Sequence, residues 1–390
     1  MRILFLVVVI DVLGFGILVP LVPYMADRFG AAPVIITAIL GSYSLAQLIA
    51  APLWGRLSDR FGRRPILLSS LAGAFASYVL LGFAENLWWL LLSRILAGIM
   101  AGNLSAAFAY AADRSAPEMR AKSMGLVGAA IGIGFMIGPA IGGVLAGENQ
   151  QAANFTVPAA VSAGLSSVAM LLVWFALPES HGPEARAHAH HPRLHPLQML
   201  AQRPALRSLT AAAFLVIASQ AILESIFAIW SMNRFGFGPR TVGFVMFLLA
   251  MFAVAMQGGL VRVLVPRFGE VRLGIFGVLS FVTGLVIVAQ AHDLATVLAG
   301  FALCGIGAGA FSPSAAALAS KEAGAHDRGA VMGTYQAGGS LARGCVPFFS
   351  GAIYSGLGAN APFLVGACIT LPAAWLIWRS RRLASRIGPG

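Results

Sequence analysis

Four ionisable side chains occur inside long apolar stretches of this 390-residue chain: Asp11, Arg94, Glu224 and Arg343. A charge in hydrocarbon is costly unless it is paired or hydrated, and a carboxylate can also avoid the cost by taking up a proton. Proton uptake and release is therefore the chemistry that these residue types could perform, and we predict that the four form a proton-coupling set. The alternative for Asp11 is an aspartate held in place by helix packing alone.

Partners for these charges can be expected within each half of the chain. Arginine keeps its charge and needs an anion or water beside it, so Asp11 is the expected partner of Arg94, with a pairing that loosens when Asp11 is protonated. Asn103 is nine residues from Arg94, on the opposite side of a continuous helix, and is expected to contact a neighbouring helix instead. Glu224 and Arg343 could pair with each other or could each face a central cavity.

Polar and aromatic side chains near the second pair of charges are candidates for substrate binding. Gln220 is one helical turn before Glu224. Gln336 is two turns before Arg343, so each glutamine shares a helix face with the charge that follows it. Phe227 could add an aromatic wall, although such side chains more often pack in the core or face lipid. We predict a substrate-binding set of Gln220, Phe227 and Gln336.

A compact charged turn at residues 55–65 separates two of the apolar stretches. Asp59 falls at the end of the preceding helix, where the macrodipole disfavours an anion, and three arginines of the turn are close enough to compensate it. Gly62 permits a tight change of direction. We predict a conformational switch here, formed by Gly55, Asp59, Arg60, Gly62, Arg63 and Arg64.

A glycine-rich motif at residues 134–143 contains Gly138 and Pro139. Pro139 removes a backbone hydrogen bond and is expected to kink its helix, and the glycines allow the close helix contact that the kink creates. We add both residues to the conformational-switch set. A dinucleotide-binding loop is excluded because no strand precedes the motif and an apolar segment surrounds it.

The composition indicates which elements must position these residues. Hydrophobic residues make up 58% of the chain and charged residues 10%, against about 45–50% and about 25% in a soluble domain, so this is an integral membrane protein. Apolar stretches of about twenty residues are typical of spanning helices and not of barrel strands. We predict an all-α membrane protein with twelve transmembrane helices, at residues 3–25, 34–56, 66–84, 87–111, 122–146, 156–177, 207–231, 241–261, 272–290, 294–318, 329–354 and 361–378.

The distribution of lysine and arginine predicts the orientation. All but five of the 26 basic residues lie on the cytoplasmic side if both termini are cytoplasmic. The net charge of +12 is spread over short loops, which indicates attraction to anionic lipid headgroups and not to nucleic acid. Few lysines beside many arginines hint at a GC-rich bacterial gene, so we expect a multi-pass protein of the bacterial inner (cytoplasmic) membrane.

An internal repeat relates the two halves of the chain, with an offset of about 207 residues. Residues 57–63 match 264–270, and residues 98–102 match 305–309. We therefore expect two six-helix bundles related by pseudo-two-fold symmetry, with a substrate site between them near the membrane midplane. The predicted domains are residues 1–178, a cytoplasmic linker at 179–205, and residues 206–390.

The predicted linker is rich in histidine, at positions 181, 188, 190, 191 and 195, which invites a metal interpretation. A solvated, mobile linker is the preferred account, and the three cysteines have no metal-ligand spacing. We therefore predict no metal and no cofactor. No nucleophile elbow or phosphate loop is present, so we do not expect an enzyme.

Three stretches carry a resemblance to a known family. The turn Ser58-Asp59-Arg60-Phe61-Gly62-Arg63-Arg64-Pro65 resembles the loop between helices 2 and 3 of major facilitator superfamily transporters, and most closely that of the tetracycline/proton antiporters within the drug/proton antiporter group. Residues 11–16 resemble the first helix of those antiporters. Residues 134–143 resemble the motif that marks antiporter members of the superfamily.

The resemblance implies functional roles for Asp11, Asp59 and Arg94. Some tetracycline exporters carry an acid, a histidine and an acid in spans 3, 8 and 9. This chain has Ser77, Ala253 and Phe281 at those positions, which leaves the drug class open.

The leading hypothesis is a proton-coupled efflux antiporter that exports a tetracycline-like or other amphiphilic drug by alternating access. The alternative is a proton-coupled importer of a small solute such as a sugar or an organic anion, which predicts more polar cavity residues and leaves the motif at 134–143 unexplained. The expected partners are a small-molecule drug, protons and the lipid bilayer, with no nucleic acid, and the protein is expected to be a monomer.

Overall fold

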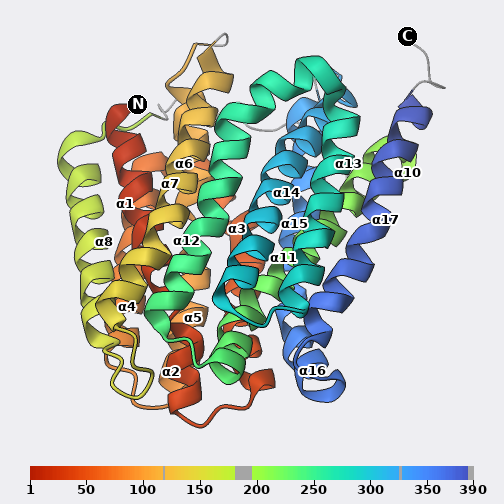
Figure 1. Cartoon of the computed structure of the whole chain (residues 1–390). Helices are drawn as coiled ribbons and strands as arrows, with labels where there is room; N and C mark the ends of the chain where they lie inside the picture. The colour runs from red at the N-terminus through yellow and green to blue at the C-terminus, as the bar shows by residue number, and fades with distance from the viewer. Residues whose placement is uncertain (117–118, 181–195, 325–326, 385–390) are drawn as a thin grey trace. The chain divides into compact units, whose positions relative to one another are not determined.

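The computed structural model describes residues 1–116, 119–180, 196–324 and 327–384, and within these ranges all regular structure is helical, with no strand. Figure 1 shows the helices in chain order. They are α1 (Arg2–Leu18), α2 (Val22–Arg28), α3 (Pro33–Phe61), α4 (Arg63–Gly82), α5 (Leu87–Met100), α6 (Asn103–Asp113), α7 (Arg120–Ala146), α8 (Thr156–Ala176), α10 (Pro196–Gln202), α11 (Pro204–Phe235), α12 (Pro239–Ala255), the π-helical turn η2 (Met256–Leu260), α13 (Val261–Ala289), α14 (Leu294–Lys321), α15 (Arg328–Cys345), α16 (Pro347–Leu357) and α17 (Ala361–Ala384).

Ten stretches of the described residues are long and apolar enough to cross a membrane. The longest of them, Pro239–Ala289, has 51 residues, more than twice the roughly 20 that one crossing needs. Gly269 interrupts its helical backbone with φ 77°. The prediction of an all-helical membrane protein is therefore confirmed for the described residues, while the count of twelve spans and the cytoplasmic side of the termini stay predictions.

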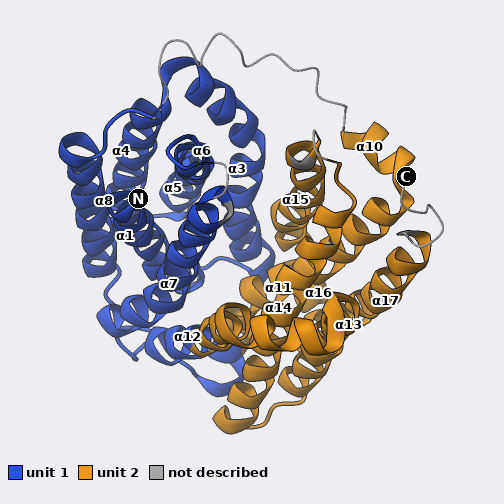
Figure 2. Ribbon diagram, turned by 90° about the horizontal axis from the view of Figure 1, so that it is seen from above, with its two compact units in different colours: residues 1–190, 231–247 blue, residues 191–230, 248–390 orange. Residues whose placement is uncertain are grey.

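The chain divides into two compact units, shown in two colours in Figure 2. Unit 1 comprises residues 1–190 and 231–247, and unit 2 comprises residues 191–230 and 248–390. In unit 1, α1 packs along α7 and α8, and α4 packs along α8. Aliphatic side chains from α1, α4, α6, α7 and α8 form its core.

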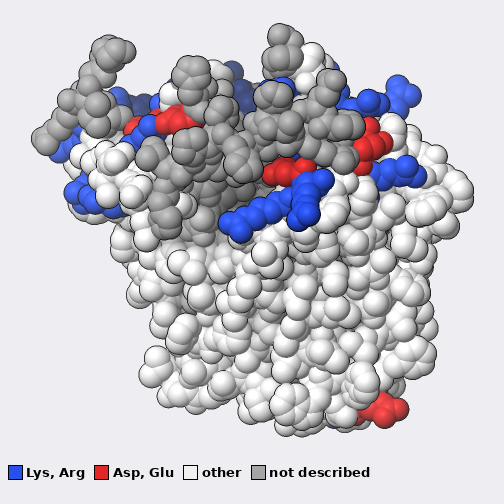
Figure 3. All heavy atoms as spheres, turned by 180° about the vertical axis from the view of Figure 1, so that it is seen from behind, with Lys and Arg blue, Asp and Glu red and all other residues white. Residues whose placement is uncertain are grey.

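In unit 2, α13 packs against α14 and α17. Within the predicted linker, Pro196–Gln202 forms α10, and its Met199 is buried in the core of this unit. The linker histidines lie outside the described residues. Figure 3 shows wide surfaces that carry no Lys, Arg, Asp or Glu side chain, as expected for helices that contact lipid.

The repeated turns share one backbone feature. Gly62 lies between α3 and α4 with φ 104°, and Gly269, its counterpart in the repeat, has φ 77°. Both values fall in the left-handed region, which glycine adopts without the steric penalty that other residues meet. The tight turn predicted at Gly62 is confirmed, and the second copy of the repeat has the same kind of break.

Candidate functional site

Asp11 lies within α1 and is buried, with 7% of its surface exposed. Its carboxylate accepts a hydrogen bond from the side-chain amide of Asn103, the first residue of α6. No ion pair joins Asp11 to Arg94, although both lie within the described ranges, so the expected pairing is wrong.

Arg94 of α5 is also buried, with 2% of its surface exposed. Its Nε and Nη2 atoms have no hydrogen-bond partner among the described residues. Tyr43 of α3 and Tyr78 of α4 lie close enough to interact electrostatically with both Asp11 and Arg94. The two charges therefore share a buried environment whose nearest polar groups are phenols, and a buried guanidinium with free donors is suited to bind an anion.

A break in the helix explains why Asn103 and not Arg94 contacts Asp11. α5 ends at Met100, α6 begins at Asn103, and Ala101 between them leaves the helical region with ψ 41°. The rotation of about 100° per residue that a continuous helix imposes is lost across such a break. Asn103 consequently turns towards α1.

The charges of unit 2 are arranged differently. Glu224 on α11 and Arg343 on α15 are both exposed and interact electrostatically, without a direct ion pair in the described part of the chain. Gln220 Nε2 donates to Glu224 Oε1 at 2.9 Å. Gln336 is exposed on α15 and lies on the same face of that helix as Arg343. The structure thus brings the second pair of charges near each other, with both side chains exposed at the surface of their helices.

Phe227, the remaining residue of the predicted substrate-binding set, is fully buried. Its ring centroid is 4.3 Å from that of Phe301 and 6.3 Å from that of Trp230. In this structure it belongs to an aromatic core in unit 2, and its contact with substrate stays a prediction.

Arg63 is the centre of the charged turn. Its buried side chain donates to Asp59 Oδ1 at 2.7 Å and to Asp113 Oδ2 at 3.0 Å. The carboxylate of Glu179 accepts hydrogen bonds from the backbone amides of Arg63, at 2.9 Å, and Arg64, at 3.1 Å. An anion at that position is favourable because the amides and the positive end of the α4 dipole point to it.

The other arginines of the turn contribute less to its charge balance. Arg60 is exposed and lies over the ring of Phe61, and Arg64 donates to the backbone carbonyl of Trp174. Gly55 lies within α3 with open space where a side chain would be. The expected compensation of Asp59 is therefore confirmed for Arg63, one of the three candidates.

Gly138 and Pro139 lie in α7 where that helix packs closely against α1. A Cβ atom on Gly138 would be 2.7 Å from Gly16 Cα, which is too close for any side chain. Further along α7, a Cβ atom on Gly143 would be 2.9 Å from Arg240 Cα of α12. α7 therefore packs backbone to backbone against two neighbours, as the glycine-rich motif predicts.

Glu148, two residues after α7 ends, connects that end to the start of α12 within unit 1. Its carboxylate accepts from the backbone amides of Gly238, at 2.9 Å, and Thr241, at 3.0 Å, and from Thr241 Oγ1 at 2.8 Å. Beside it, the hydroxyl of Tyr24 donates to the carbonyl of Phe237 at 2.8 Å. We call this set of contacts the Glu148 clasp.

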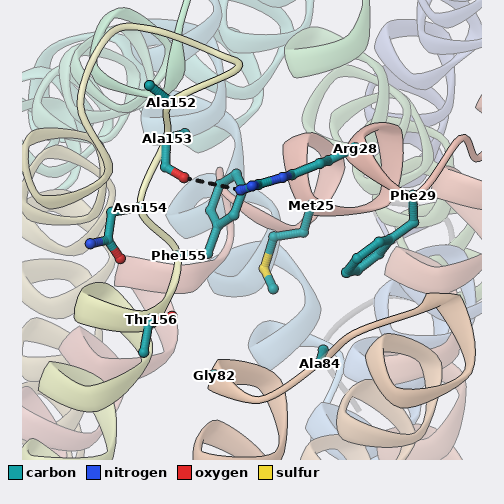
Figure 4. Close-up of a pocket in the computed structure, with 10 residues that line it drawn as sticks. All are labelled: Met25, Arg28, Phe29, Gly82, Ala84, Ala152, Ala153, Asn154, Phe155 and Thr156. Atoms are coloured by element: carbon teal, nitrogen blue, oxygen red, sulfur yellow. Dashed lines mark hydrogen bonds between the residues drawn. The ribbon is translucent and has the colours of Figure 1, made fainter.

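A cavity of about 450 Å³ lies where α2 and α4 end and α8 begins. Figure 4 shows Arg28 at this cavity, where its Nη1 donates to the carbonyl of Ala153 at 3.4 Å. None of the predicted site residues lines it. Within the described ranges, no three His, Cys, Asp or Glu side chains gather to hold a metal ion.

Sequence reasoning missed two polar groups that hold these sites together, Glu148 and Glu179. The helix contact expected for Asn103 is confirmed, because its side chain reaches α1. The identity of its partner, Asp11, is not predicted, because the break that turns Asn103 towards it has only the weak signal of Gly102 beside it. Glu179 is easier to recognise in the sequence, because an acidic residue just after one helix can accept hydrogen bonds from the free backbone amides at the start of another.

Comparisons with known proteins agree on one family. The model described as Major Facilitator Superfamily matches residues 4–289 and 260–390. The tetracycline resistance protein, class G, of Vibrio anguillarum is 30% identical and covers 94% of each chain. Major facilitator superfamily domain-containing protein 10 of Bos taurus is 29% identical, covering 95% of this chain and 90% of the relative.

A solved structure is similar over nearly the whole chain. The crystal structure of the human organic anion transporter MFSD10 (TETRAN) has a TM-score of 0.73 and 25% sequence identity, covering 96% of this chain and 98% of that one. The resemblance to tetracycline antiporters drawn from residues 55–65 is matched by this set of relatives, which includes tetracycline resistance proteins.

Proposed function

The chain belongs to the major facilitator superfamily, and on that premise we propose that it is a proton-coupled antiporter that exports tetracycline or another amphiphilic drug by alternating access. The observation that carries the proposal is the buried carboxylate of Asp11 in a membrane-spanning helix. A carboxylate at such a position is costly to keep, and it can exchange its charge for a proton.

Antiport is favoured over uptake by the packing of α7. Residues 134–143 resemble the antiporter motif, and the glycines of that motif bring α7 directly against the backbones of α1 and α12. The similarity to tetracycline resistance proteins supports the direction of transport and the class of drug. In this proposal the proton and the drug are bound in alternation, because each is held best by a different conformation.

A second candidate is the transport of a small organic anion. The exposed guanidinium of Arg343 favours it, since an accessible arginine in an apolar helix can bind a carboxylate. The name of the human relative, an organic anion transporter, points the same way. We further propose that the protein acts as a monomer in a bacterial inner membrane, without metal or cofactor.

The test uses purified full-length protein in liposomes with a pH-sensitive dye inside and a pH gradient across the membrane. We expect tetracycline to stimulate proton movement in the wild type and not in Asp11→Asn. Exchange of labelled for unlabelled tetracycline, which moves no net proton, should continue in that variant. Unchanged proton movement in Asp11→Asn would remove Asp11 from the mechanism, and a response to an organic anion alone would favour the second candidate.

A further inference from the structure

Asn103 occupies a junction between the Asp11 carboxylate and the break in the helix of Arg94. Its side-chain Nδ2 donates to Asp11, and its Oδ1 accepts from the backbone amide of Leu104 at 2.8 Å. Its own backbone amide donates to Ser70 Oγ at 3.0 Å. Both ends of the amide are thus engaged, and its orientation is fixed by one bond to α1 and one within α6.

The rest of the break is held by other side chains. Trp54 Nε1 of α3 donates to the carbonyl of Ile99, and Ser70 Oγ of α4 donates to the carbonyl of Met100. These bonds satisfy backbone groups that the interrupted helix leaves without partners in an apolar surrounding. The Asn103 amide is therefore left to serve Asp11.

No other direct partner competes for the Asp11 carboxylate among the described residues. The charged or titratable groups that face it are Tyr43 from α3, Tyr78 from α4 and, beyond the two phenols, Arg94 from α5. α8 has no titratable side chain, and α7 has none after Lys122. Within the described part of the chain, Asn103 is consequently the one group that donates a hydrogen bond to this carboxylate.

A small cavity adjoins the pair. Its volume is about 10 Å³, and Asp11 and Asn103 are its two polar lining residues among aliphatic ones of α1, α4 and α6. That volume is about the least that can hold a single water molecule. A water there would contact the carboxylate and the amide together, so the cavity offers a place from which a proton can reach Asp11.

From these contacts we propose that Asn103 is a positioning residue for proton exchange: it holds the ionised carboxylate of Asp11 and transmits its charge state to the break between α5 and α6. The inference rests on the proposed function only in taking Asp11 as the group that exchanges protons. A proton from the cavity water binds a carboxylate oxygen of Asp11 and makes the site neutral. The acid O–H then competes with the amide of Leu104 for Asn103 Oδ1, and the bond from Nδ2 weakens because a neutral acid is the poorer acceptor.

Trp54 provides a readout without any drug, because its indole is bonded at the break. The experiment titrates tryptophan fluorescence of the purified full-length protein between about pH 4 and about pH 9, a range that spans the ordinary carboxyl value and neutrality. The contribution of Trp54 is identified with Trp54→Phe. We expect a pH-dependent Trp54 signal that Asp11→Asn removes.

Three variants then separate positioning from structure. Asn103→Ser keeps an oxygen near the Leu104 amide but cannot reach Asp11, and we expect its midpoint to move to higher pH by about one unit. Asn103→Gln keeps the amide, and the midpoint of its titration should lie between the midpoints of Asn103→Ser and the wild type. Ser70→Ala disturbs the break without touching Asp11, so it should alter the size of the signal and not its midpoint.

An unchanged midpoint in both Asn103 variants, or a Trp54 signal that persists in Asp11→Asn, would overturn the inference. Should Asn103→Ser fail to fold, Asn103→Gln and Ser70→Ala still decide, since a midpoint shift in Ser70→Ala larger than in Asn103→Gln contradicts a positioning role. If the titration behaves as expected while tetracycline stimulates no proton movement in liposomes, the proposed function fails and the inference stands.

Discussion

Unit 1 buries its membrane charges and unit 2 leaves them exposed. Asp11, Arg94 and Arg63 have 7%, 2% and 7% of their surfaces exposed, whereas Glu224 and Arg343 are accessible to solvent. A buried charge without a partner inside the protein is costly, so the loss or protonation of a buried group acts on the fold. An accessible charge can be satisfied by water or by a solute. The proposed function uses this difference, with proton exchange at the buried Asp11 of unit 1 and the exposed charges of unit 2 as candidates to meet the transported molecule.

The two copies of the repeated turn show the same contrast. In unit 1 the buried Arg63 joins two carboxylates, and in unit 2 Glu270 pairs with Lys321 at 2.6 Å on the surface. The backbone glycine is shared, but the charge network is not. Repetition of the chain has therefore preserved the shape of the turn and not its electrostatics.

The largest effect on stability is expected for Arg63→Ala. A small effect would contradict the contrast between the buried charges of unit 1 and the exposed charges of unit 2. Removing the buried guanidinium leaves Asp59 and Asp113 without their shared cation. Because these two side chains are 43% and 26% exposed and can be hydrated, we expect a loss of about 1.5–3 kcal/mol of stability. Thermal unfolding in detergent measures it. The matched control is Arg60→Ala, an exposed arginine of the same turn, for which we expect a change within about 0.5 kcal/mol. Equal melting temperatures for the two variants would contradict the central place given to Arg63.

Glu224→Gln should sharpen the contrast between the two carboxylates. Because Glu224 is exposed, the variant should fold normally and keep its proton coupling. It should lose about tenfold in affinity for a cationic drug, roughly the 1.4 kcal/mol of one charged contact, and less for a neutral one. Binding of both drugs to the purified protein, set beside Asp11→Asn, measures this. Abolished proton movement in Glu224→Gln would assign proton exchange to unit 2.

The Glu148 clasp is built around an exposed carboxylate that has several hydrogen-bond partners. It tests whether an exposed charge can be removed without loss of local stability. Glu148→Gln keeps the shape of the side chain but removes its charge and replaces one acceptor oxygen with an NH2 group, so at least one of the three hydrogen bonds is lost, with an expected cost of about 1–2 kcal/mol locally. Amide hydrogen exchange at Gly238 and Thr241 should accelerate about tenfold in consequence. Gln151→Ala is the control, because Gln151 is an exposed residue close to Glu148 in the chain, and exchange at those amides should stay unchanged in it. The same acceleration in both variants would show that the Glu148 clasp does not protect these amides.

The smallest effect concerns an ion pair of unit 2 outside the spans. The hydrogen bond from Arg203 holds the pKa of Asp327 below its ordinary value of 3.8. A lowered pKa in the folded protein contributes stability that is present above the ordinary value and is lost as the pH falls through the folded one. Since both side chains are partly exposed, Arg203→Met should cost about 0.5 kcal/mol near neutral pH, and the cost should diminish as the pH falls below the ordinary carboxyl value. Melting curves across that range measure it, and a pH-independent loss would point to packing.

Much of the site could be predicted where the reasoning was local. The helix dipole at Asp59 required a nearby cation, and Gly62 marked the turn, so the contact with Arg63 followed from residues a few positions apart. The partner of Asp11 could not be found in this way. It depends on an interruption at Ala101, next to which backbone groups bond to side chains of two other helices, α3 and α4. A continuous helix across residues 94–103 would instead place Asn103 on the side opposite to Arg94.

The sequence allows two arrangements for Glu224 and Arg343 of unit 2, which could pair with each other or each face a central cavity. Both charges are exposed, so neither is forced to a unique partner by burial. The prediction of the aromatic Phe227 as a cavity residue rested on residue type alone. In this structure Phe227 is buried among other rings, and its contact with substrate stays a prediction.

Glu179 adds a mechanical consequence to the charged turn. It is two residues before the stretch 181–195, through which the chain passes from the first half to the second, and its carboxylate is fastened to the first amides of α4. The residues that follow α8 are thereby fixed to the start of α4, so a displacement at Glu179 would be felt first at the turn that holds Arg63.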